Sequence, residues 1–136
     1  MRISIANFEV NVPQNWLAQY TKTPTLFFIY SPLEENDSFQ ENCNLTEEAV
    51  SVNMSIKNYM DSVVTVLDGY YKDLNILEQN RDSLLFTGMV SGIKLKQLQY
   101  FYKKDNKIYT LTFSSTVADY CRYEEQFKQI ASSFTY

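Results

Sequence analysis

The stretch Leu84–Thr116, LLFTGMVSGIKLKQLQYFYKKDNKIYTLTFSST, decides the fold. Asp105-Asn106 separates two runs rich in aromatic and β-branched residues, and Asn and Asp are typical of tight turns because they tolerate positive φ. A turn centred on this dipeptide produces a face on which every cross-strand pair is apolar or aromatic. These pairs are Tyr102–Tyr109, Tyr100–Leu111 and Leu98–Phe113.

The opposite face of the same hairpin is mixed, with Phe101 paired to Thr110, Gln99 to Thr112 and Gln97 to Ser114. A slip of one residue would pair side chains from opposite faces, so the pattern favours this register. Ser91-Gly92 predicts a second turn, which pairs Val90–Ile93, Gly88–Leu95 and Leu85–Leu98. Leu85, Leu98 and Phe113 then form one row across a three-stranded antiparallel meander.

Composition indicates a packed globular protein. The chain has 136 residues, of which 45% are hydrophobic and 15% aromatic, and we expect residues 1–136 to form a single domain. The formal net charge of −4 argues against sequence-independent nucleic-acid binding and against docking on an anionic membrane surface. No apolar run is long enough to span a bilayer, so we expect no integral membrane segment.

Few residue types for catalysis or metal binding are present. The absence of histidine removes the usual general base and the commonest zinc ligand. Cys43 and Cys121 form no CxxC pair, and we interpret them as two buried thiols, with one disulfide as the alternative. Glu34, Glu35, Asp37 and Glu41 share one polar loop, which we interpret as solvated rather than as a cation site. The sequence therefore predicts no catalytic, cofactor or metal residue.

Outside the meander, alternation and periodicity predict further elements. We expect strands at 8–12, 24–30, 44–52 and 75–80, with Pro13–Trp16 as a turn and 34–42 as a loop. We expect helices at 55–74, capped by Ser55, and at 117–134, where Thr116 and Asp119 resemble a capping box. The order predicts an α+β fold, a three-layer α/β/α sandwich around a central, mostly antiparallel twisted sheet.

Several motifs resemble the PsbP-like and DcrB-like family of domains. The opening F-x-V-x-V-P-x-x-W (Phe8 to Trp16) and the run Phe39–Asn44 are similar to the start of bacterial PsbP-related proteins. The run from Gly88 to Thr112 and the terminal Ser133-Phe134 also match. One departure is Asn106, where many relatives have Gly at the hairpin turn; Asn also enters the left-handed region. The resemblance covers nearly the whole chain from Phe8 and implies a PsbP-like α/β/α sandwich.

The resemblance also implies a non-enzymatic binding protein without a cofactor, because the common theme of the family is binding a protein partner. We expect a protein-partner adaptor or chaperone, which would be cytoplasmic if Met1 is the true start. The other version is the soluble domain of a periplasmic or envelope protein whose signal was removed. The alternative function is a small-molecule or metal-binding module. We expect no nucleic-acid partner, and a monomer or weak homodimer.

A possible ligand or partner face lies on the mixed side of the meander, where polar and aromatic side chains alternate. Its members are Phe86, Gln97, Gln99, Phe101, Thr110, Thr112 and Ser114. The other interpretation is a partly solvated sheet face held by cross-strand pairs, each contributing about 0.2–1 kcal/mol. Lysines also gather around the meander and suggest a local basic patch, formed by Lys94, Lys96, Lys103, Lys104 and Lys107.

The register and core assignment predict the effect of two truncations. Trp16→Ala and Leu98→Ala should each lower the free energy of unfolding by about 2–5 kcal/mol, because both remove a large side chain from the core. Urea denaturation of the purified variants measures the loss. A loss of less than about 1 kcal/mol at both positions would contradict the register and the core assignment.

Overall fold

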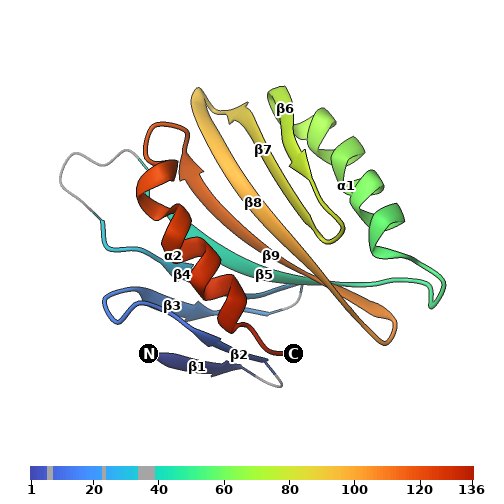
Figure 1. The fold of residues 1–136 in the computed structure, drawn as a ribbon, viewed down its shortest axis with the longest axis horizontal. Coiled ribbons are helices and arrows are strands. Elements are labelled where there is room, and N and C mark those ends of the chain that lie inside the picture. Colours follow the sequence, from blue (N-terminus) through green and yellow to red (C-terminus); the bar gives the residue numbers. More distant parts are fainter. Residues whose placement is uncertain (6–7, 23, 34–38) are drawn as a thin grey trace.

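The computed structural model describes residues 1–5, 8–22, 24–33 and 39–136 (Figure 1). Two short strands come first, β1 (Arg2–Ile5) and β2 (Phe8–Asn11), and pair with each other in a small sheet of their own. The remaining strands form a seven-stranded antiparallel sheet in the order β3-β4-β5-β9-β8-β7-β6. These strands are β3 (Leu17–Tyr20), β4 (Thr25–Tyr30), β5 (Asn42–Ala49), β6 (Lys72–Gln79), β7 (Ser83–Val90), β8 (Ile93–Lys104) and β9 (Lys107–Thr116).

The meander of β7, β8 and β9 has the register predicted from the sequence. Leu98 pairs with Phe113 and Gln97 with Ser114, and Leu85 lies opposite Leu98 on the third strand. Both turns contain positive φ angles, at Ser91 (51°) and Gly92 (79°) in the first. In the second turn the positive φ belongs to Asp105 (56°) and not to Asn106. Asp, like Asn, visits the left-handed region at low cost, so the turn does not need a glycine.

The two helices, α1 (Ile56–Tyr70) and α2 (Tyr120–Ser133), pack on opposite faces of the large sheet. Phe113 and its row face α2, and we call this side of the sheet the α2 face. Gln97, Ser114 and the residues in their rows point the other way, toward the α1 face, because successive residues of a strand alternate. The three-layer α+β arrangement expected from the sequence is therefore confirmed.

The helices are offset from each other along the sheet. In Figure 1, α2 crosses in front of β9 and β5, whereas α1 lies beside β6 at the other end. The packing agrees, since α2 packs against β9 and β2 while α1 packs against β6 and β8. Each helix consequently covers about one half of its face, and the diagonally opposite halves are left without a helix in the described part of the chain.

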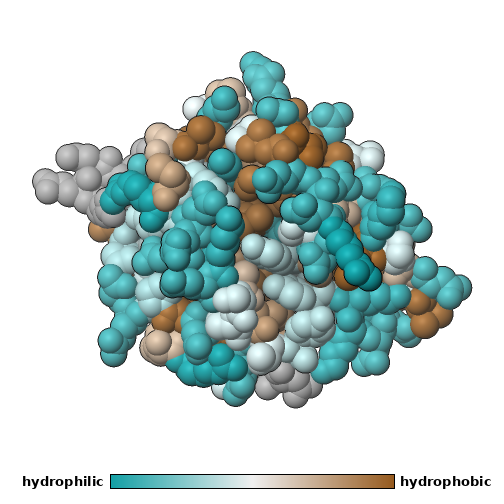
Figure 2. Space-filling model, in the orientation of Figure 1, coloured by the Kyte–Doolittle hydropathy of each residue, from teal (hydrophilic) through white to brown (hydrophobic). Residues whose placement is uncertain are grey.

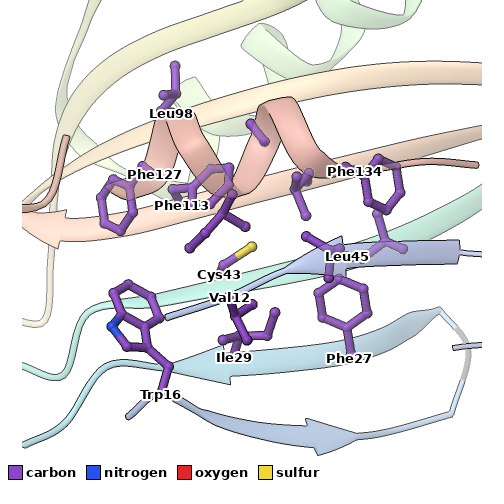
Figure 3. Packing of buried hydrophobic residues seen from close by; sticks show 14 of the residues in the cluster. Val12, Trp16, Phe27, Ile29, Cys43, Leu45, Leu98, Phe113, Phe127 and Phe134 are labelled. Carbon is purple, nitrogen blue, oxygen red and sulfur yellow. The ribbon is translucent and has the colours of Figure 1, made fainter. Parts of the chain in front are cut away.

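The larger core lies between the α2 face, α2 and the β1–β2 hairpin (Figure 3). Phe113 and Phe127 meet there with ring centroids 5.1 Å apart. Trp16, expected in the core, is buried and packs its ring edge-on against Tyr123 and Phe127. Burying an aromatic side chain of this size stabilises a fold by about 1.5–3 kcal/mol, so this cluster is a major source of stability.

The first helix is shorter than predicted. Ser55 caps α1 as expected, with its hydroxyl accepting the Asn58 N–H at 3.0 Å, but the helix ends at Tyr70. Asp73 then has φ of 56°, and Leu74 belongs to β6. Leu74 still packs on the cluster beneath α1, which explains why it fitted the helical spacing. The prediction that Leu74 packs on the apolar cluster was correct, and its assignment to the helix was wrong.

The sequence also missed β1 and β3, which are only four residues long. β3 shows no clear alternation, because three of its four residues are exposed. In β1 an alternation was available, since Ile3 is buried between the exposed Arg2 and Ser4. The other boundaries shifted by a few residues: β5 starts at Asn42 and ends at Ala49, and α2 starts at Tyr120 after Asp119. Thr116 still stabilises the start of α2, since its hydroxyl accepts a hydrogen bond from the Asp119 N–H at 3.3 Å.

The prediction of two buried thiols is half wrong. Both cysteines are free, but only Cys43 is buried, in the core between the sheet and α2. Burial raises the pKa of the Cys43 thiol well above its ordinary value, so it stays protonated and unreactive at neutral pH. Cys121 is exposed because it follows the buried Tyr120 on α2 and points to the outer side of the helix.

The packing of Tyr71 over Gly88 predicts opposite effects at two glycines. A Cβ added at Gly88 would lie 2.7 Å from the Tyr71 Cβ, so we expect Gly88→Ala to destabilise the protein by about 1–3 kcal/mol. Gly69, in α1, has nothing within 4 Å, so Gly69→Ala should stabilise it by about 0.5–1 kcal/mol. Thermal unfolding of both variants compares the effects, and equal melting temperatures would contradict the packing.

Candidate functional site

The expected partner face is brought together on the α1 side of the sheet. Gln97 and Gln99 on β8 lie opposite Ser114 and Thr112 on β9, and Phe101 lies opposite Thr110. Phe86 lies opposite Gln97 on β7. All seven predicted residues therefore share one face, and they are buried. We call the five polar members (Gln97, Gln99, Thr110, Thr112 and Ser114) the polar ladder.

Side chains of the polar ladder are bonded mostly to one another. The Gln97 amide donates to the Ser114 hydroxyl at 2.7 Å, and the Tyr71 hydroxyl donates to the Gln97 carbonyl oxygen at 3.0 Å. The Gln99 amide donates to the Thr112 hydroxyl at 3.3 Å. The Gln99 Oε1 atom is buried and has no hydrogen-bond partner among the described residues. A buried acceptor without a donor costs about 1–3 kcal/mol, so the ladder is incompletely satisfied.

Helix α1 covers the aromatic end of this face. Phe86 and Phe101 are almost completely buried, together with Met60 of the helix. Tyr71 packs edge-on against Phe86, with ring centroids 5.7 Å apart, and Tyr59 packs against Phe101 at 6.0 Å. A partner cannot touch these two phenylalanines while α1 is in place. The accessible part of the face must therefore lie on the other side of the polar ladder.

Beyond the ladder, the α1 face continues over β5, β4 and β3 without a helix above it in the described chain. We call this surface the open half. Its floor carries Asn42 and Asn44, which lie beside Tyr30 and Phe28. The rings of Phe28 and Tyr30 stack with centroids 5.8 Å apart and stay half-buried. Leu17 on β3, opposite Tyr30, is 68% exposed.

A hollow of about 250 Å³ separates α1 from β5 at the border of the open half. The helix contributes apolar side chains to it, above all Val63 and Val66, and Val66 is 70% exposed. On the other side of the hollow lies Glu48 of β5, whose carboxylate accepts a hydrogen bond from the Tyr59 hydroxyl. Burial raises the pKa of Tyr59, and the bond to Glu48 raises it further, so this hydroxyl remains a donor at neutral pH. The open half is thus a polar floor between two apolar borders.

In the part of the chain that the structure describes, the acidic and cysteine side chains lie apart from one another. Among the described residues, no group of three or more Cys, Asp or Glu side chains is placed to hold a metal ion. Glu34, Glu35 and Asp37 of the acidic loop lie outside the described residues, and Glu41 is 1% exposed rather than solvated. Within the same described ranges, no helix is both long and apolar enough to cross a membrane.

The predicted basic patch is divided. Lys94 and Lys96 lie near the start of β8, whereas Lys103 and Lys104 lie at its end, about 23 Å further along the strand. Lys96 is placed 4.5 Å from the ring centroid of Tyr120, and Lys103 donates to the carbonyl oxygens at 52 and 54. The lysines therefore form two separate groups, because β8 is a long strand.

Sequence analysis missed the apolar borders of the open half. Phe28 and Tyr30 alternate with Phe27 along β4 and so lie on the opposite face, but nothing in their pattern tells whether a helix covers them. Val66 could have been noticed, because it lies off the stripe of α1 residues that repeats at three- and four-residue spacing. An apolar residue outside the buried stripe of a helix is the signal that was available.

Comparison with known proteins identifies the fold. No family model and no curated protein matches the sequence. Solved structures do match, among them CyanoP, the cyanobacterial PsbP of Synechocystis sp. PCC 6803, at 14% identity and a TM-score of 0.63 over 99% of this chain and 91% of that one. PA94, a protein of unknown function from Pseudomonas aeruginosa, is 13% identical with a TM-score of 0.71, covering 98% of this chain and 94% of its own.

A third match is LpqN of Mycobacterium tuberculosis, which is involved in cell envelope biogenesis. It is 8% identical with a TM-score of 0.63 over 94% of this chain and 82% of that one. At such low identities these likenesses establish the fold alone. The fold expected from the sequence motifs is confirmed, and this chain has a PsbP-like fold.

The hydrogen bond from Tyr71 to the polar ladder can be tested by removing one hydroxyl. Tyr71→Phe should lower the free energy of unfolding by about 1–2 kcal/mol, because it leaves the buried Gln97 oxygen without its donor. Tyr70→Phe is the matched control, since Tyr70 is exposed and should change stability by less than about 0.5 kcal/mol. Chemical denaturation measures both, and equal losses would show that the ladder does not depend on Tyr71.

Proposed function

We propose that this protein is a non-catalytic binding domain whose partner, another protein, contacts the open half of the α1 face beside the polar ladder. The observation that carries the proposal is the arrangement of apolar side chains on both sides of that surface. Leu17, Phe28 and Tyr30 border it on one side, and Val63 and Val66 of α1 border it on the other.

Interfaces of this kind need apolar and aromatic anchors surrounded by groups that can hydrogen-bond. The stacked Phe28–Tyr30 pair supplies aromatic surface, and Asn42 and Asn44 supply donors and acceptors between the borders. The seven residues predicted from the sequence contribute indirectly in this proposal. They hold the floor of the surface in place, since the polar ladder joins β8 to β9 directly beside it.

A binding role agrees better with these residues than catalysis does. The chain has no histidine, Cys43 is buried with a raised pKa, and the polar groups of the ladder are engaged with each other. A general base must reach its substrate and titrate near neutral pH, and these side chains meet neither condition. Of the solved structures with this fold, none named above is described as an enzyme.

Two settings suit such a domain. One is a cytoplasmic adaptor or chaperone, and the other is the globular part of an envelope protein. The involvement of LpqN in cell envelope biogenesis supports the second setting by analogy of fold. The gene region upstream of Met1 distinguishes them, because an envelope protein requires an export signal there.

The test uses matched substitutions of exposed side chains. The tagged protein is used to capture partners from its native host, and the captured protein is then purified and titrated by calorimetry. Leu17→Asp and Val66→Asp should weaken binding by at least about tenfold, since each places a charge at an apolar border. Val52→Asp is the control, because Val52 is 65% exposed, close to the 70% of Val66, but belongs to the loop before α1.

Two results would contradict the proposed function. Equal affinity of all three variants would place the partner on another surface. Clear thermal stabilisation by calcium, manganese or a small molecule, with no protein partner captured, would favour the alternative of a ligand-binding module, because a specific ligand stabilises the native state.

A further inference from the structure

The hollow between α1 and β5 combines an apolar wall with a single carboxylate. Val63, Val66 and Leu67 of the helix form the wall, and Glu48 of β5 lies on the other side. Glu48 lies opposite Ile108, which belongs to the cluster beneath α1, so the hollow is on the α1 face. Figure 2 shows the opposite side of the molecule, where the outer side of α2 is hydrophilic. The hollow therefore borders the surface that we assign to the partner.

The carboxylate of Glu48 is held in position by a tyrosine. It accepts a hydrogen bond from the Tyr59 hydroxyl, and the Tyr59 ring is itself packed edge-on against Phe101. An ionised carboxylate has about four lone-pair positions, so this bond leaves most of them open. No lysine or arginine forms an ion pair with Glu48 in the part of the chain that the structure describes.

Two lysines near this end of the sheet are engaged elsewhere. Lys103 lies in the same row of the α1 face as Glu48, two strands away, but its ammonium donates to carbonyl oxygens of the loop before α1. Lys107 pairs with Glu47 at 3.7 Å, and Glu47 points to the α2 face because successive residues of β5 alternate. Neither lysine neutralises the carboxylate at the hollow.

We propose that the hollow takes one basic side chain, a lysine or an arginine, of the partner protein. The hydrocarbon stem of such a side chain lies along Val63, Val66 and Leu67, and its charged head reaches Glu48. The inference rests on the proposed function, because it names the anchor that the partner places at the α1 border of the open half. Charge complementarity agrees with it, since this chain has a formal net charge of −4.

The size and chemistry of the hollow favour a basic side chain over other occupants. Its volume of about 250 Å³ is below the range of about 300–1,000 Å³ that is usual for small-molecule sites. Val66 at its border is 70% exposed, so a side chain can enter from outside. An acidic side chain would be repelled by Glu48, and an apolar one would remove water from the carboxylate without replacing its hydrogen bonds.

The test uses defined probes, because the natural partner is not identified. Nα-acetylarginine amide and Nα-acetyllysine amide carry the two basic side chains. Nα-acetylcitrulline amide is the control, since citrulline has nearly the shape of arginine but no charge. Each probe is titrated at constant ionic strength into protein with labelled methyl groups, and NMR follows the resonances of Val63, Val66 and Leu67.

We expect both basic probes to shift these resonances, and the arginine probe to bind about three- to fivefold more tightly than the citrulline probe, as for a partly exposed ion pair. Glu48→Gln should abolish this difference, because glutamine lacks the charge but can still accept the hydrogen bond from Tyr59. Glu47→Gln is the matched control. It removes the same charge from the neighbouring residue of β5, on the other face, and should preserve the difference.

A second experiment separates this inference from the proposed function. With the captured partner, Glu48→Gln should weaken binding by at least about tenfold. Leu17→Asp, on the far border of the open half, should weaken the partner but leave the probes unaffected. If only Leu17→Asp weakens the partner, the inference is wrong and the proposed function stands. If neither variant weakens it, the partner contacts another surface and the proposed function is wrong too.

Two results with the probes alone would also overturn the inference. Equal affinity of the arginine and citrulline probes for the unmodified protein would show that the hollow does not recognise a charge. Binding of free spermidine at micromolar concentration, abolished by Glu48→Gln, would show that the hollow is a site for a free polyamine and not for a partner's side chain.

Discussion

The pairing of β8 with β9 is the constraint on which the rest of this structure depends. Its register places Leu98 with Phe113 on one face and Gln97 with Ser114 on the other. Because side chains alternate along a strand, a shift by one residue would move the polar ladder into the main core and the core residues out of it. The turn between β8 and β9, with positive φ at Asp105, holds this register in place, and the turn at Ser91-Gly92 holds the register of β7 with β8.

The two faces then determine where the helices pack. The aromatic core on the α2 face is covered by α2 and the β1–β2 hairpin, and the smaller cluster around Phe86 and Phe101 is covered by α1. Because the helices are offset, each face keeps one half without a helix in the described chain. The open half is polar with apolar borders.

The meander, both helices and the layered fold could be predicted from the sequence, because their signals are local: period-2 pairs around two turns, and an apolar stripe on each helix. β3 could not, since three of its four residues are exposed and show no alternation, whereas the short alternation of β1 around the buried Ile3 was overlooked. The C-terminal end of α1 was predicted too late in the chain. Leu74 belongs to β6 but packs into the same apolar cluster as the helix, so it continued the helical spacing. For the site, the sequence predicted that the seven residues share one face of the sheet. It could not predict which part of that face α1 covers, because this depends on tertiary packing and not on a local pattern.

The most direct test of this account is solvent paramagnetic relaxation measured by NMR on the methyl groups of the free protein. The offset of the helices predicts strong enhancement for Val66, beside the open half, and for Leu77 and Met89, on the part of the α2 face over β6 and β7 that no described helix covers. Leu45 and Ile108, which are completely buried, should show almost none. Equal protection of all these methyl groups would contradict the account, because the two half-faces would then be covered in the protein on its own.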